Sequence, residues 1–171
     1  MARVIVIDDN RTFLEAASAL LGTHNAHLII HTVPDAEKGL RAIQQVDYDV
    51  VVTDYHLPGF NGLEFLKKCR ELRPDTPVVM LTGYGDQEIE ERAKQLGAYA
   101  FLHKPVQPEI FLSVLSRSLL RSHLRRNMAP LPADSGAPPA YVADQLVNRI
   151  QRLNDRLLRA LSSAFDERRH S

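Results

Sequence analysis

Residues 50–62 read VVVTDYHLPGFNG, and this stretch decides the fold class. Residues 50–52 are three consecutive β-branched valines, a pattern typical of a strand that is buried on both faces. The strand ends in Asp54, and a Pro-Gly turn leads into a helical pattern that begins at Gly62. Strands that are apolar on both faces belong to parallel sheets that helices cover on each side.

The same order, a short apolar strand followed by a helix, recurs on both sides of this stretch. The expected strands cover residues 4–7, 27–31, 50–54, 77–82 and 99–103. The expected helices cover about 13–21, 34–45, 62–72 and 86–96, and a last one begins near Pro108 and continues through Arg126. Five such units in about 120 residues predict an α/β fold, namely a flavodoxin-like doubly wound five-stranded parallel sheet with strand order 2-1-3-4-5.

The composition is that of a soluble globular domain with a modest appendage. The chain has 171 residues, of which 44% are apolar and 25% are charged. No apolar run approaches the roughly 18 residues that cross a bilayer, and the N-terminal apolar run is too short for a signal peptide, so no membrane contact is expected. The single cysteine, Cys69, excludes an internal disulfide framework and favours a reducing compartment. A cytoplasmic location is therefore expected.

The C-terminal part of the chain differs in charge from the rest. Residues 1–116 carry 11 Lys and Arg against 16 Asp and Glu, whereas residues 117–171 carry 10 Arg against 5 acidic residues. We expect the α/β domain to cover residues 1–127 and a Pro/Ala-rich linker, MAPLPADSGAPPA, to cover residues 128–140. One long amphipathic helix, free of Gly and Pro, is expected over residues 141–169.

The helix expected at 141–169 has an apolar seam with alternating spacings of four and three residues, which is the a/d repeat of a coiled coil. The seam consists of Leu146, Ile150, Leu153, Leu157, Ala160 and Ala164. It can be covered by a second copy, by the chain's own α/β domain or by a partner groove, and self-association is the first choice. The same helix carries a row of arginines, which could contact phosphate groups or an acidic partner, although a solvated basic face is the commoner meaning.

Polar residues stand at the carboxyl ends of four expected strands that are neighbours in this sheet order. They are Asp8 and Asp9 after the first strand, Asp54 after the third, Thr82 after the fourth and Lys104 after the fifth. Ligands of doubly wound sheets bind at this edge, so these groups are expected to converge. Three close carboxylates repel one another unless a cation lies among them, and oxygen ligands with room for water suit Mg²⁺. A carboxylate nucleophile beside a metal ion, a lysine and a hydroxyl suits phosphoryl transfer.

On these motifs the chain resembles the receiver domain of two-component response regulators, of the chemotaxis-regulator type, over about residues 2–122. The matching segments are Asp8-Asp9, Asp54 with Leu57-Pro58-Gly59 and Asn61-Gly62, Met80-Leu81-Thr82-Gly83, Gly97-Ala98, Phe101 and Lys104-Pro105. The resemblance implies that Asp54 is the phospho-acceptor, assisted catalytically by Lys104 and Thr82, and that Thr82 and Phe101 form a switch pair. It also implies a Mg²⁺ ion bound by Asp9, Asp54, the backbone carbonyl of His56 and, through water, Asp8.

The function that the resemblance implies is that of a response regulator. It would accept a phosphoryl group from a histidine kinase or a histidine phosphotransfer protein in a Mg²⁺-dependent reaction, and would signal by altered protein contacts or dimerisation. It would be no enzyme beyond its own phosphorylation and dephosphorylation. Two alternatives stay open: a phosphotransfer intermediate in a phosphorelay, and a DNA-binding regulator that uses the basic C-terminal helix. Nucleic acid is disfavoured, because about 30 residues after the linker are too few for a winged helix or a three-helix DNA-binding unit.

Overall fold

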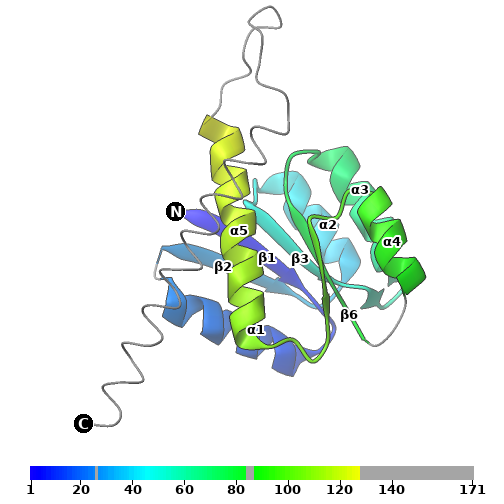
Figure 1. Cartoon of the computed structure of the whole chain (residues 1–171), viewed down its shortest axis with the longest axis horizontal. Helices are drawn as coiled ribbons and strands as arrows, with labels where there is room; N and C mark the ends of the chain where they lie inside the picture. Colours follow the sequence, from blue (N-terminus) through cyan, green and yellow to red (C-terminus); the bar gives the residue numbers. More distant parts are fainter. Residues whose placement is uncertain (26, 84–86, 128–171) are drawn as a thin grey trace, which may run out of the picture. The chain divides into compact units, whose positions relative to one another are not determined.

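The computed structural model describes residues 1–25, 27–83 and 87–127 of the chain, and residues 1–127 form one compact unit. Figure 1 shows an open twisted sheet with helices on both of its faces. The long strands are β1 (Ala2–Ile7), β2 (Leu28–Val33), β3 (Val50–Asp54), β6 (Val78–Thr82) and β7 (Ala100–His103). The helices are α1 (Arg11–His24), α2 (Ala36–Gln45), α3 (Gly62–Leu72), α4 (Gln87–Gln95) and α5 (Pro108–Asn127).

The sheet has the order β2-β1-β3-β6-β7, and all of its neighbouring strands are parallel. Counted along the chain, the five long strands therefore have the predicted order 2-1-3-4-5, and the predicted fold class is confirmed. The sequence interpretation missed one element, because residues 55–61 were expected to be a plain loop. They contain a short antiparallel hairpin of β4 (His56–Leu57) and β5 (Phe60–Asn61), which Gly59 closes with a φ of 71°.

Two hydrophobic clusters lie on opposite faces of the sheet, because successive side chains of a strand point to opposite sides. Val4 and Val6 of β1 pack with α1 and α5, whereas Ile5 and Ile7 pack with α2, α3 and α4. The cluster with Ile5 and Ile7 is called the second cluster, and Phe65 of α3 is among its largest fully buried side chains. Strands buried on both faces explain the uninterrupted apolar runs in the sequence.

Three helices begin at a side-chain cap, and two of these caps border the candidate site. The side chain of Asn10 accepts a hydrogen bond from the Phe13 N–H at 3.1 Å, and that of Asn61 accepts one from the Glu64 N–H at 2.8 Å. Asp35 caps α2 in the same way. The sequence predicts that this helix begins at the proline before Asp35, but it begins after Asp35 because that side chain forms the cap.

Helix α5 continues to Asn127, as predicted, and its last turns are tied to the start of β3. Asp49 lies just before β3 and is buried; its Oδ2 accepts a hydrogen bond from the Arg3 N–H at 2.8 Å. Its Oδ1 accepts one from the Ser122 hydroxyl and pairs with the Arg126 guanidinium, both at 3.2 Å. The linker and the amphipathic helix expected beyond residue 127 lie outside the described residues and stay predictions. Within the described part, no helix is long and apolar enough to cross a membrane.

Candidate functional site

The predicted site residues gather at the carboxyl edge of the sheet. Asp8 directly follows β1, Asp54 ends β3 and Thr82 ends β6, and all three side chains are buried. Asp9 is exposed at the mouth of the same site. One carboxylate oxygen from each of Asp8, Asp9 and Asp54 lies within 4.8 Å of the others. The convergence expected from parallel strands is therefore present for these four residues.

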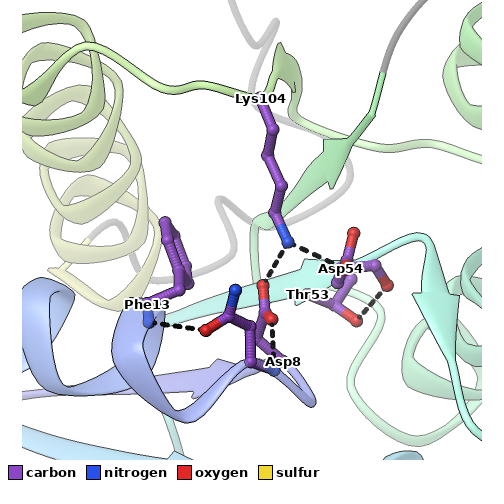
Figure 2. A network of polar contacts seen from close by, with 6 residues as sticks. Asp8, Phe13, Thr53, Asp54 and Lys104 are labelled. Atoms are coloured by element: carbon purple, nitrogen blue, oxygen red, sulfur yellow. Dashed lines mark hydrogen bonds and ion pairs between the residues drawn. The ribbon is translucent and has the colours of Figure 1, made fainter.

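Lys104 bridges two of the buried carboxylates (Figure 2). Its Nζ donates to Asp8 Oδ2 at 2.5 Å and to Asp54 Oδ2 at 2.8 Å. The backbone N–H of Lys104 donates to the Thr82 carbonyl at 2.6 Å, and the peptide bond that follows Lys104 is cis. The sequence interpretation placed the lysine where it meets an incoming phosphoryl oxygen. In the described structure, the ammonium compensates the negative charges of Asp8 and Asp54, and its contact with a phosphoryl oxygen stays a prediction.

The burial of these charges and their pairing act in opposite directions on their pKa values. Burial raises the pKa of Asp8, although the Lys104 ammonium and the Asn10 N–H, which donates to Oδ1 at 2.9 Å, work against it. For Lys104, burial favours the neutral amine, but the carboxylates of Asp54 and Asp8 outweigh it, so the pKa is raised and the ammonium is retained.

The donor set fits a hard divalent cation. Asp54 Oδ1 is buried and has no hydrogen-bond donor among the described residues, although its partner oxygen is held by Lys104. An unpartnered buried carboxylate oxygen is costly unless a cation or a water completes its surroundings. With Asp8 and Asp9 beside it, this oxygen offers the oxygen-only environment that Mg²⁺ prefers.

His56 and Phe101 lie next to the site and not inside it. His56 is in β4, and its exposed ring meets the Tyr55 ring edge to face at 4.8 Å. The metal-binding role expected for its backbone carbonyl stays a prediction. Phe101 is a half-buried residue of β7, opposite Met80 of β6, and packs against the second hydrophobic cluster.

Two further residues shape the site, and the sequence interpretation did not identify their roles. The Phe13 ring lies 5.0 Å from the Lys104 Nζ and meets the Phe111 ring of α5 edge to face at 6.4 Å. The helical spacing of Phe13 indicated only a core position. Gly62 lies so close to the chain after Asp54 that a Cβ would come within 2.6 Å of the Tyr55 Cα. The motif Asn61-Gly62 carried that signal, because a glycine after a turn often marks a close backbone approach.

Comparison with known proteins leads to the same family as the sequence motifs. Residues 4–116 match the family described as the response regulator receiver domain. The C4-dicarboxylate transport transcriptional regulatory protein DctD of Pseudomonas aeruginosa is 36% identical over 118 residues, which are 68% of this chain and 25% of that protein. The transcriptional regulatory protein FixJ of Bradyrhizobium diazoefficiens is 28% identical over 153 residues, which are 90% of this chain and 68% of that protein. The chain thus spans only a quarter of the length of the first of these relatives.

Among solved structures, the chemotaxis protein CheY4 of Vibrio cholerae is 32% identical, with a TM-score of 0.64 over 70% of this chain and 99% of that one. Receiver domains are signalling domains in which a kinase phosphorylates an aspartate, and they generally bind Mg²⁺ in an acidic pocket. The family match covers more than half of the chain, and it includes the acidic edge described above and all strands except the first two residues of β1. The chain therefore belongs to the response regulator receiver domain family.

Proposed function

We propose that Asp54 accepts a phosphoryl group from the phosphohistidine of a histidine kinase or of a histidine phosphotransfer protein. The observation that carries this proposal is the state of the Asp54 carboxylate. One oxygen is held by Lys104 at 2.8 Å, and the other is buried without a donor in the described part of the chain. The carboxylate is therefore oriented through one oxygen, and no protein donor holds its other oxygen in the described residues, which suits a carboxylate that must bind a cation and act as a nucleophile.

In the proposed step, one oxygen of the Asp54 carboxylate attacks the phosphorus and forms the new O–P bond. The P–N bond to the donor imidazole breaks, and its electron pair returns to the ring nitrogen, which takes up a proton. Lys104 can swing from Asp54 to a phosphoryl oxygen because its side chain is 25% exposed. Thr82 can donate its hydroxyl to another oxygen from the neighbouring strand β6. Both act by positioning and by charge stabilisation.

Asp9, Asp54, the backbone carbonyl of His56 and, through water, Asp8 would hold Mg²⁺ at this site. When bound, the ion neutralises charge on the phosphoryl oxygens and on the acidic cluster.

The output that we propose is a changed protein contact. Thr82 and Phe101 lie on the neighbouring strands β6 and β7, so a Thr82 that turns toward a phosphoryl group would alter the space beside Phe101. The residue range 141–169 would then self-associate or meet a partner according to the state of Asp54. A kinase partner and a reduced, buried Cys69 support a cytoplasmic location.

Intact-mass spectrometry after incubation with acetyl phosphate and Mg²⁺ tests the acceptor. We expect one added phosphoryl group, lost when EDTA removes the metal or when Asp54→Asn removes the acceptor. Asp47→Asn is the matched control, because its carboxylate is exposed and pairs only with Arg73 in the described structure. Full modification of Asp54→Asn would show that another residue accepts the group.

Light scattering on the full chain tests the output. Beryllofluoride with Mg²⁺ mimics the phosphoryl group, and we expect it to change the mass of the wild-type chain but not that of Asp54→Asn. An unchanged wild-type mass would exclude a dimerisation switch and leave a heterologous partner as the output.

A further inference from the structure

A second cluster of charge lies at the opposite edge of the sheet, where β6 and β7 begin. A cavity of about 240 Å³ is lined there by Arg70 of α3, Arg121 and Arg125 of α5, Asp75 and Tyr99. Strand β6 has five residues, so this edge is roughly 13 Å from Thr82 along the strand. We call this cavity the arginine pocket.

Arg70 enters the arginine pocket across the backbone of Gly97. Gly97 has a φ of 86°, and a Cβ at this position would come within 3.2 Å of the Arg70 Nε and 3.5 Å of its Cζ and Nη2. Any side chain here would push the guanidinium away. The turn between α4 and β7 therefore leaves room for a guanidinium to lie flat against the chain.

Two more arginines surround Tyr99 from α5. The Arg121 guanidinium lies 5.3 Å from the centre of the Tyr99 ring. Arg117, one helical turn earlier, donates to the Ser113 hydroxyl at 2.8 Å, but its Nε is buried without a partner in the described structure. Burial raises the pKa of Tyr99 in spite of Arg121 and Arg117, so its hydroxyl remains protonated and able to donate.

The charges of the arginine pocket do not balance. Asp75 supplies a single carboxylate, and it pairs with Arg125 at 2.7 Å. Within the described ranges, Arg70, Arg117 and Arg121 form no ion pair with any carboxylate, although the neighbouring Arg125 does. The cavity itself is lined by the guanidiniums of Arg70, Arg121 and Arg125 and by the carboxylate of Asp75. These groups leave an excess of two positive charges inside a half-enclosed cavity. Half-buried cations without anions favour the binding of an anion from solution.

We propose that the arginine pocket binds a phosphate group, either free or as the monoester of a small molecule. A phosphate monoester carries up to two negative charges near neutral pH, which matches the excess. Guanidinium forks match tetrahedral oxyanions by paired hydrogen bonds. The volume lies below the roughly 300–1,000 Å³ of drug-sized sites, so it has room for a phosphate group with at most a small organic part.

A titration followed by ¹H–¹⁵N NMR on the full-length Asp54→Asn chain tests the proposal. EDTA is present, so that neither the acceptor nor a metal at the acidic site can account for binding. Inorganic phosphate, glycerol 3-phosphate and sodium sulfate are added at constant ionic strength. We expect saturable shifts of the Gly97, Ala98 and Tyr99 amides, and the comparison of the first two anions shows whether a free or an esterified group is preferred.

Three variants make the result specific. Arg121→Gln should weaken binding at least tenfold, and Arg70→Lys, which keeps the charge but loses the fork, should weaken it as well. Arg41→Gln is the control, because Arg41 is exposed and pairs with Glu37 on α2. Spectra without ligand verify that each variant is folded. Non-saturable shifts, equal shifts with sulfate, or equal affinity in all three variants would overturn the proposal.

Discussion

Replacing Lys104 with methionine removes the one cation that the described structure places between Asp8 and Asp54. Methionine has a similar length and can keep its contact with the Phe13 ring through sulfur. The substitution therefore isolates the loss of the ammonium, which donates at 2.5 and 2.8 Å to two carboxylates.

The expected cost follows from burial. The side chains of Asp8 and Asp54 are 0% and 8% exposed, so neither carboxylate can recover full hydration when Lys104 is lost. Removing one partner of a buried ion pair lowers the free energy of unfolding by about 3–5 kcal/mol. Because Lys104 is partly exposed, we expect the lower value, about 3 kcal/mol. Mg²⁺ should stabilise the folded variant by more than it stabilises the folded wild-type chain, since the ion supplies the missing positive charge.

Cys69 provides the assay. It is the only cysteine, it is buried, and burial raises the pKa of its thiol to about 12, so a disulfide reagent reacts with it only when the domain opens. A loss of about 3 kcal/mol corresponds to roughly a hundredfold faster labelling in EDTA, since about 1.4 kcal/mol is a factor of ten. Added Mg²⁺ should slow the reaction again.

Lys94→Met is the matched control. Lys94 pairs with Glu90 at 2.7 Å, but its side chain is 65% exposed, so labelling should change little. If Lys104→Met labels no faster than Lys94→Met, the acidic site does not depend on the lysine for charge compensation, and the reasoning fails.

Asp35→Ala should destabilise the domain by about 1 kcal/mol in chemical denaturation, because the carboxylate caps α2, whereas Asp35→Asn should keep most of the cap. The Lys38 side chain and N–H lower the pKa of Asp35. The stability that the Asp35 carboxylate contributes is therefore present above its ordinary pKa of 3.8 and is lost as the pH falls through the lower pKa of the folded state. An equal difference in stability between wild type and Asp35→Ala at pH 2 and at pH 7 would contradict this. Gly62→Ala should cost about 1–3 kcal/mol because its Cβ would press on the Tyr55 backbone. Gly22→Ala, where nothing lies within 4 Å, should stabilise α1 by up to about 1 kcal/mol, and equal thermal shifts for both glycine variants would refute the steric argument.

The sheet order and the gathering of Asp8, Asp54 and Thr82 could be predicted because both follow from strand alternation. Parallel strands joined through helices all end at the same edge, so a polar residue after each apolar run must face that edge. The resemblance then assigned a role to each residue without any distances.

What could not be predicted depends on contacts between distant segments. Lys104 reaches Asp8 from 96 residues away, and nothing in the sequence says which of the carboxylates it meets. Phe13 and Phe111 meet because α1 and α5 cover the same face of the sheet. Arg70 and Arg121 share a cavity only because α3 and α5 end at the same edge. The β4–β5 hairpin is too short to leave a periodic pattern.

The ties between Asp49 and the end of α5 have a consequence for domain grafting. The family match ends at residue 116, yet Ser122 and Arg126 hold Asp49 from beyond that point, and the backbone of Arg3 holds it from the other end of the chain. A chimaera joined at residue 116 would strand a buried carboxylate with only one of its three partners. Fusions that place a reporter or a foreign output segment on this receiver should therefore be joined after Asn127, where the helix has completed its own attachment.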